Sequence, residues 1–295
     1  MTEIFGVPTQ ALFGQLLIGL INGSFYALLS LGLAVIFGLL NIINFTHGAQ
    51  YMMGAFCAYL LVSRIGLGYW WALVLVPLAV GAFGVLIERT MLKPLYKLDH
   101  LYGLLLTFGL ALIIQGLFRN EYGSSGLPYP IPEQLTGGRN LGFMFLPNYR
   151  AWVIVASLIV CFTTWMVIEK TKLGSYLRAA TENPQLVQAF GINVPRMITL
   201  TYGFGVGLAA LAGVMAAPIY QVSPQMGADL IIVVFAVVVI GGMGSIMGSI
   251  VTGFALGLIE GLTKVFYPEA SNTVIFIIMA IVLMIRPAGL FGTTR

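Results

Sequence analysis

The sequence EKTKLGSYLRAATENPQLVQAFGINVPRM, residues 169–197, lies between two strongly apolar stretches and decides the class of this protein. It is the longest polar passage that is neither proline-rich nor glycine-rich. Residues 175–181 and 184–190 each predict about two turns of helix, with Asn183 as N-cap and Pro184 at the first helical position. Gly191 is placed to end the second helix. Two short capped helices with basic side chains around them predict a docking surface for a soluble partner.

The composition around this loop is typical of a protein embedded in a lipid bilayer. Hydrophobic residues make up 59% of the chain and charged residues only 8%, whereas soluble domains carry about 25% charged residues. The 36 glycines suit close packing of helices in lipid. The sequence therefore predicts an all-α polytopic membrane protein with one transmembrane domain, residues 1–295.

Ten apolar segments can be placed along the chain, and two of them are short. They are 11–29, 31–43, 48–63, 69–88, 101–119, 151–168, 198–218, 229–243, 246–264 and 272–286. A helix of about 13 residues covers roughly 20 Å, less than the roughly 30 Å hydrocarbon core, so 31–43 is too short to span alone. Fusing or half-inserting short segments such as 31–43 and 229–243 gives eight spans, and the prediction is therefore about eight to ten.

The basic residues orient these spans. If the loop 169–197 is cytoplasmic, nine basic side chains lie inside and five outside, as expected from the excess of Lys and Arg in cytoplasmic loops. The inner set is Arg89, Lys93, Lys97, Lys170, Lys172, Arg178, Arg196, Arg286 and Arg295, and the outer set is Arg64, Arg119, Arg139, Arg150 and Lys264. The Gly- and Pro-rich connection 120–150 is then external, where it suits a gate rim or a contact with an extracytoplasmic partner.

A weak internal similarity links residues 31–61 with residues 230–260. Each is an apolar run, a small or polar turn and a second apolar run, and on the ten-segment division both turns face the cytoplasm. This predicts a duplicated unit, four helices before and four after a central pair, as in many transporters. Chance similarity of glycine-rich apolar sequence is the alternative.

No catalytic constellation is apparent. The chain lacks the glycine-rich phosphate loop that ends in Lys followed by Ser or Thr, so any nucleotide hydrolysis must belong to another subunit. His47 and His100 have no carboxylates nearby in sequence that would suggest a metal. Cys57 and Cys161 lie in apolar segments and are interpreted as packing residues. We therefore expect a protein that is not an enzyme and holds no cofactor or metal of its own.

Acidic side chains near the spans are few, and Glu260 is the one that invites a functional interpretation. Acids within membrane segments mark proton or ion pathways by default, whereas Glu88 and Asp229 lie at segment ends. Lys264 follows Glu260 by four residues, so a structural ion pair near the external interface is the alternative.

Polar residues in three further places have two interpretations each. Asn41, Asn44, Thr46 and His47 fall in the turn NIINFTHG, where they either cap a helix break or line the cytoplasmic end of a pathway. Asn22 and Tyr26 share a segment with the small-residue face of Gly19 and Gly23, and Asn22 either bonds across helices or faces a pathway. Thr107 and Gln115 invite the same two interpretations. The turn GGMGSIMGS, residues 241–249, predicts close backbone packing.

The chain resembles the permease subunit of branched-chain amino-acid ABC importers of the LivH type. The resemblance rests on NGSFYALLSLGLAVIFGLLNIINFTHGAQYMMGAF, LGSYLRAATENPQLVQAFGI, GGMGSIMGSIVTGFALGLIEG and IRPAGLFG, in this order over nearly the whole chain. It implies the fold of an ABC importer permease, in which the cytoplasmic loop inserts coupling helices into a cleft of an ATPase subunit. That role maps onto Arg178, Ala179, Ala180, Glu182, Asn183, Pro184 and Gly191.

The resemblance also implies partners, location and substrate class. We expect a second permease subunit in a heterodimer, two cytoplasmic ATPase subunits that bind the ATP, an extracytoplasmic substrate-binding protein, and a bacterial cytoplasmic (inner) membrane. The expected cargo is a branched-chain or other hydrophobic amino acid. Related permeases carry urea, amides or other small solutes, and a self-sufficient secondary carrier that uses Glu260 is a further alternative.

Overall fold

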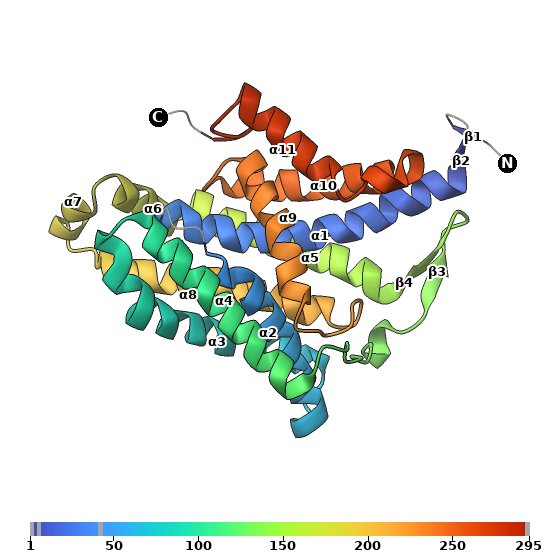
Figure 1. The fold of residues 1–295 in the computed structure, drawn as a ribbon, viewed down its shortest axis with the longest axis horizontal. Helices are drawn as coiled ribbons and strands as arrows, with labels where there is room; N and C mark the ends of the chain where they lie inside the picture. Colours follow the sequence, from blue (N-terminus) through green and yellow to red (C-terminus); the bar gives the residue numbers. More distant parts are fainter. Residues whose placement is uncertain (1–2, 5–6, 41–43, 293–295) are drawn as a thin grey trace.

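The computed structural model describes residues 3–4, 7–40 and 44–292. Its long helices run roughly along one axis of the molecule, with the short helices α6 and α7 at one end and a β-hairpin near the other (Figure 1). The α-helices are α1 (Thr9–Leu40), α2 (Thr46–Leu60), α3 (Tyr69–Ile87), α4 (His100–Tyr122), α5 (Asn148–Lys170), α6 (Lys172–Glu182), α7 (Pro184–Ala189), α8 (Val194–Ala216), α9 (Met226–Gly241), α10 (Ile246–Phe266) and α11 (Val274–Ile285). Shorter elements are β1 (Glu3–Ile4), β2 (Val7–Pro8), β3 (Gly138–Asn140), β4 (Phe145–Pro147) and the single turns η1 (Leu61–Ile65), η2 (Glu88–Leu92), η3 (Lys93–Lys97), η4 (Glu133–Leu135) and η5 (Pro268–Ala270).

Six helices of the described chain are long and apolar enough to cross a membrane. They contain α1, α3 with its continuation to Lys97, α4, α5, α8 and α10, and two shorter apolar helices, α9 and α11, accompany them. The predicted all-α polytopic class is confirmed. Six is below the predicted eight to ten, because the segments 48–63, 229–243 and 272–286 form helices of 15, 16 and 12 residues, shorter than a full span.

The division into ten segments is wrong at the first helix. Segments 11–29 and 31–43 are not separate, because α1 continues from Thr9 to Leu40 without a break. Ser30 sits in the middle of α1, and its hydroxyl donates to the carbonyl of Ala27 at 3.2 Å and to that of Ser249 in α10 at 3.2 Å. The polar side chain is therefore satisfied inside the helix and does not end it.

The helix pair α1 and α10 packs through glycines. A Cβ added to Gly257 would lie 2.4 Å from the Cα of Gly23, and one added to Gly19 would lie 2.5 Å from the carbonyl oxygen of Gly257. These backbones approach as closely as small residues allow in lipid. The predicted small-residue face of Gly19 and Gly23 is confirmed, with α10 as its partner.

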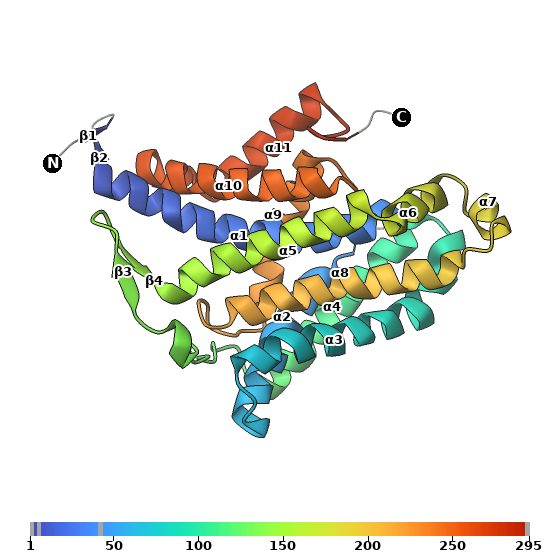
Figure 2. The same cartoon turned by 180° about the vertical axis from the view of Figure 1, so that it is seen from behind.

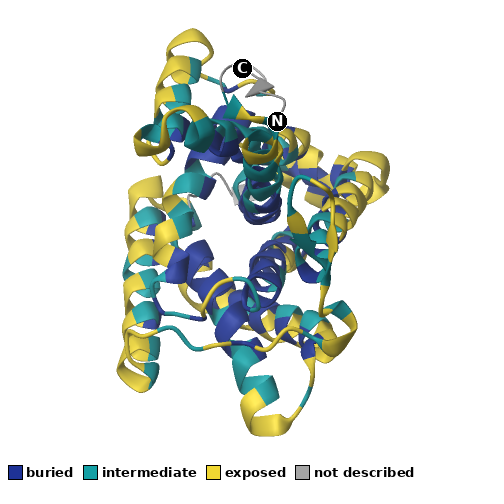
Figure 3. Cartoon of the chain, turned by 90° about the vertical axis from the view of Figure 1, so that its right-hand side faces the viewer, coloured by how far each residue is buried: buried dark blue, intermediate teal, exposed yellow. Residues whose placement is uncertain are grey.

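A second close pair joins α2 and α8. A Cβ on Gly54 would lie 2.3 Å from the carbonyl oxygen of Ala210, and one on Gly213 would lie 2.0 Å from that of Tyr51. Buried residues gather on these inner helices, whereas exposed residues cover the outer ones (Figure 3). The two glycine-based pairs form the core on which the peripheral helices rest.

The connection 120–150 lies at the end of the molecule opposite α7 (Figures 1 and 2). It contains the antiparallel hairpin of β3 and β4, and a bridge between Leu127 and Val222 ties it to the segment after α8. Tyr129 is buried in this connection, and burial raises the pKa of its phenol to about 12. The connection is thus an anchored structure on the side predicted to be external.

The two glycine- or polar-rich turns do not lie at equal depth. His47, at the start of α2, contacts the carbonyl of Leu29 at 3.0 Å, and Leu29 precedes the end of α1 by about 16 Å of helix. The second turn lies at the α6 end, where Gly244 contacts Gly38 and shares a cavity with Arg178. The described end of the first turn, at His47, therefore lies inside the bundle beside Leu29 and not level with the end of α1, so the prediction that this turn faces the cytoplasm is wrong.

The second turn is a packing device, as predicted. Gly242 has φ of +100°, a conformation that favours glycine. The tail after α11 lies against it, with Leu290 donating its backbone N–H to Ile240 at 2.8 Å and Phe291 to Gly241 at 3.1 Å. Ser245 then caps α10 by accepting from the N–H of Gly248 at 3.1 Å.

Candidate functional site

Three of the predicted pathway residues meet where the middle of α1 packs against the last two turns of α10. Glu260 is 4% exposed and accepts a hydrogen bond from the Tyr26 hydroxyl at 2.6 Å and one from the Asn22 amide at 3.4 Å. Lys264 forms an ion pair with the same carboxylate. The structural interpretation of Glu260 and Lys264 as an i, i+4 pair is confirmed, and Asn22 bonds across helices as predicted.

This polar cluster forms one side of a cavity of about 370 Å³, called the outer cavity below. Tyr220 extends the cluster by donating its hydroxyl to Asn22 Oδ1 at 3.1 Å. The cavity lies beside the segment between α8 and α9. Its lining residues are Asn22, Phe25, Tyr26, Tyr51, Tyr220, Gln221, Ser223, Met226, Asp229 and Leu230.

The lining of the outer cavity combines apolar surface with a few polar groups. Phe25, Met226 and Leu230 offer contacts to an aliphatic side chain, and the Asp229 carboxylate offers a partner for an ammonium group. Such a surface suits a small molecule that is apolar at one end and charged at the other. Asp229 lies at the end of an apolar segment, a position that gave no sequence signal for a site, and this same position brings it to the cavity.

A second polar cluster, at the start of α2, is almost completely buried. Asn44 donates to the Tyr202 hydroxyl at 3.1 Å and to Gln50 at 3.5 Å. Thr46 donates to the carbonyl of Thr107 at 2.9 Å, while the Thr107 hydroxyl accepts from the N–H of Phe45 at 3.3 Å. These bonds tie the start of α2 to α4 and α8, but the N-cap residue of α2, Phe45, receives no side-chain capping bond, and Asn44 Oδ1, His47 Nδ1 and Gln50 Nε2 are buried without a hydrogen-bond partner in the described part of the chain. The capping and pathway interpretations of this turn both stay predictions.

The remaining pathway candidates do not join either cluster. His47 is fully buried and contacts Leu29 of α1. Gln115 lies half-buried on α4, a helix at the periphery that packs chiefly against α2. Asn41 lies outside the described residues.

Glu88 is a buried acid that sequence reasoning passed over. It is 1% exposed and accepts hydrogen bonds from the hydroxyls of Tyr96 and Thr199, each at 2.7 Å. The apolar segment ends at Glu88, but helical turns continue through η2 and η3 to Lys97 and cover it. The presence of Tyr96 eight residues later is the only sequence signal for this arrangement.

The polar loop 169–197 forms the two helices that the sequence predicts, α6 and α7. Asn183 accepts from the N–H of Leu186 at 2.9 Å, which confirms it as the N-cap of α7. Gly191 ends this turn with φ of +83°. The two helices share a small apolar core with the start of α8, made of Leu177, Ala180, Val187, Val194 and Met197.

The outer face of α6 and α7 is concave and partly apolar, and we call it the tip surface. It encloses about 430 Å³ and is lined by Tyr176, Ala179, Glu182, Asn183, Leu186, Val187, Phe190 and Ile192. Phe190 is 78% exposed and Leu186 54%. Sequence reasoning missed Tyr176, Leu186 and Phe190, although Leu186 and Phe190, two large apolar side chains within the short predicted helix 184–190, were a usable signal.

The coupling residues implied by resemblance fall into three groups. Ala179, Glu182 and Asn183 line the tip surface, and Pro184 and Gly191 are exposed beside it. Ala180 is buried in the core that joins α6 to α7. Arg178 is exposed and pairs with Glu169 at the end of α5, at 3.1 Å, so it helps to hold α6 in place.

Gly174 sets the distance between α6 and α5. A Cβ at this position would lie 1.5 Å from the carbonyl oxygen of Ile168, a contact that no side chain could make. The tip surface is thus fixed rigidly to the membrane helix before it.

Comparison with known proteins identifies relatives of the whole chain. The family described as the branched-chain amino acid transport system permease component matches residues 15–283. The permease protein LivH of the Escherichia coli high-affinity branched-chain amino acid transport system is 28% identical over 305 aligned residues, which cover 99% of this chain and 98% of that protein. The corresponding protein BraD of Pseudomonas aeruginosa is 30% identical, covering 94% of this chain and 95% of that protein.

A differently named permease of the same E. coli system also matches. LivM is 28% identical over 92% of this chain and 68% of its own length. No solved structure matches the chain.

Proposed function

Because this chain belongs to the family of branched-chain amino acid transport permease components, we propose that it forms half of the membrane pathway of an ATP-driven importer of branched-chain or other hydrophobic amino acids. The observation that carries the proposal is the pair of sites on one helix bundle, the tip surface on α6 and α7 and the outer cavity beside the segment between α8 and α9. The outer cavity suits a small amphiphilic molecule, and the tip surface suits a soluble partner. An ATP-driven permease needs both.

The outer cavity supports an amino acid as cargo. A hydrophobic amino acid carries an ammonium group, which Asp229 attracts, and an aliphatic side chain, which fits against Phe25 and Met226. The buried carboxylate of Glu260 is already occupied by Tyr26, Asn22 and Lys264 and is not offered to the cargo. The cavity thus provides weak, directional contacts, which suffice where a separate binding protein supplies selectivity.

The tip surface supports coupling to an ATPase subunit. The chain has no phosphate loop of its own, so the energy must arrive through contact with another protein. Phe190 and Leu186 offer exposed apolar side chains for a cleft, and Glu182 offers a charge beside them. Because Gly174 and the pair of Arg178 with Glu169 fix α6 to α5, a pull on the tip surface is transmitted to a membrane helix.

The names of the relatives support the expected partners. LivH and LivM are two different permeases of one E. coli system, and this chain is similar to both. We therefore propose a heterodimer with a second, related permease, two ATPase subunits on the α7 side, and a binding protein against the anchored connection 120–150. The excess of basic residues at the α7 end supports a cytoplasmic α7 side, and the family supports a bacterial inner membrane as the location of this multi-pass chain.

The test is uptake of labelled leucine into vesicles that contain this chain with its partner permease. Uptake is expected to require the ATPase subunits, ATP and the binding protein, and to exceed uptake of urea by a large factor. Leucine uptake without the ATPase subunits would contradict the proposal and favour a secondary carrier. Faster uptake of urea than of leucine would be consistent with the permease role but would contradict the proposed amino-acid substrate.

A further inference from the structure

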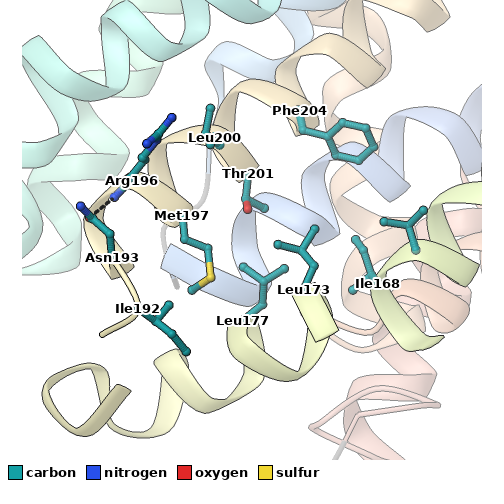
Figure 4. Close-up of a pocket in the computed structure, with 11 residues that line it drawn as sticks. Ile168, Leu173, Leu177, Ile192, Asn193, Arg196, Met197, Leu200, Thr201 and Phe204 are labelled. Atoms are coloured by element: carbon teal, nitrogen blue, oxygen red, sulfur yellow. Dashed lines mark hydrogen bonds between the residues drawn. The ribbon is translucent and has the colours of Figure 1, made fainter. Parts of the chain in front are cut away.

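A groove separate from both sites lies where α5, α6 and α8 meet. It encloses about 470 Å³ and is called the inner groove below (Figure 4). Its walls are almost entirely apolar, contributed by Ile168, Leu173, Leu177, Met197, Leu200 and Phe204. Leu200 is 57% exposed and Phe204 46%, so the groove opens to the outside of the bundle.

One end of the inner groove carries a cation. Arg196 and Asn193 lie together at that end, and Phe204 lies toward the other (Figure 4). Arg196 is exposed. Within residues 3–4, 7–40 and 44–292 the structure has two ion pairs, and neither includes Arg196. They are Arg178 with Glu169 and Lys264 with Glu260. In that described part the Arg196 guanidinium therefore has no carboxylate partner.

The inner groove lies at the depth where a membrane helix leaves the bilayer. Trp165 and Lys170 stand near the end of α5, with the Lys170 ammonium 5.7 Å from the centre of the Trp165 ring. Tryptophan and lysine at a helix end are typical of the membrane interface. From Arg196 the groove runs along α8 for about 12 Å to Phe204, that is, from headgroup depth into the hydrocarbon.

We propose that the inner groove binds one anionic phospholipid of the cytoplasmic leaflet, with its phosphate on Arg196 and an acyl chain along Leu200 and Phe204. The apolar walls match an acyl chain, and the unpaired guanidinium matches a phosphate, so the ligand must carry both. A soluble anion would leave the walls bare. A basic pocket between membrane helices on the cytoplasmic side is a recognised setting for such headgroups. The proposal goes beyond transport, and lipid binding can be measured without any transport assay.

The test is lipid titration of the purified, delipidated full chain, followed by native mass spectrometry. The probes are phosphatidylglycerol and phosphatidylcholine with identical acyl chains. We expect tighter binding of phosphatidylglycerol by about fivefold, the gain for one basic side chain near a membrane surface. Arg196→Gln is expected to remove this preference and Arg196→Lys to retain it. Arg89→Gln, a change to an exposed arginine on another helix at the same end of the molecule, is the matched control and is expected to keep the preference.

A separate variant tests the apolar part of the groove, where the acyl chain is proposed to bind. Leu200→Asn places an amide on the exposed apolar wall and is expected to weaken both lipids alike. Glycerol phosphate is expected not to compete with phosphatidylglycerol. Equal binding of the two lipids, an unchanged preference in Arg196→Gln, or competition by glycerol phosphate would each overturn the proposal. So would loss of the bound lipid when the partner permease is present, because the groove would then be a subunit contact.

Discussion

The structure changes the interpretation of Glu260 more than that of any other predicted site residue. An acid in a membrane helix suggests a proton pathway, but here Tyr26, Asn22 and Lys264 occupy its carboxylate. A carboxylate with these partners holds the middle of α1 against the last two turns of α10. Its role in the account is structural.

This role predicts the effect of removing the carboxylate. Glu260→Ala leaves the buried Tyr26 hydroxyl without its partner, and the expected loss is about 1–3 kcal/mol. The measurement is the melting temperature of the purified chain in detergent. Lys264→Ala is expected to cost less, because the lysine is about one-third exposed. Equal stability of Glu260→Ala and the parent chain would contradict the structural role.

Asp229 carries the corresponding prediction for the outer cavity. It is exposed, so Asp229→Asn should weaken leucine uptake without unfolding the chain, raising KM by up to about fivefold. Glu121→Gln, another exposed acid at the external end, is the control and should leave KM unchanged. An unchanged KM in Asp229→Asn would show that the cargo takes no contact from this carboxylate.

At the scale of elements, the two short helices α6 and α7 were the most predictable part of the molecule. Asn183, Pro184 and Gly191 are local signals, and local signals suffice for caps and turns. The course of α1 was not predictable in this way. Ser30 is satisfied by Ser249, and no sequence pattern announces a contact between residues so far apart. The burial of Glu88 could not be predicted for the same reason, because its hydrogen-bond partner Thr199 belongs to a helix far away in sequence.

A substitution at Gly174 tests whether the position of α6 depends on its close packing against α5. Gly174→Ala forces α6 away from the Ile168 carbonyl, a displacement that costs about 1–3 kcal/mol, so uptake should fall by about fivefold or more while the membrane helices remain folded. The control is Gly116→Ala in α4, where an added Cβ meets no atom within 4 Å. Normal uptake in Gly174→Ala would show that α6 is not held rigidly.

The pair of α1 and α10 carries an independent prediction about folding. Gly257→Ala would place a Cβ 2.4 Å from the Cα of Gly23 and is expected to destabilise the bundle by about 1–3 kcal/mol, seen as a lower melting temperature in detergent. Gly109→Ala, which meets no atom within 4 Å, is the control and should melt like the parent. A parental melting temperature in Gly257→Ala would mean that the two helices separate at little cost.

At the scale of the whole molecule, the sequence predicted the class and the sides of most connections. Composition and basic residues establish a polytopic membrane protein, and residues far apart in sequence, such as Leu95 and Pro184, line one cavity at the α7 end as the predicted sidedness requires. What could not be predicted is which polar side chains meet. Asn22, Tyr26 and Glu260 come together only because glycines bring α1 and α10 into contact. Whether residues 31–61 and 230–260 arose by duplication stays a prediction.

A separate ATPase is proposed to drive this permease through the tip surface. The most direct measurement uses one reconstituted preparation, in which ATP hydrolysis and leucine uptake are followed together for Phe190→Glu and Gln185→Glu. Both side chains are exposed on or beside α7, but only Phe190 lines the tip surface. The account predicts that Phe190→Glu loses ATPase association and uptake, whereas Gln185→Glu retains both. Full coupled uptake in Phe190→Glu would contradict it.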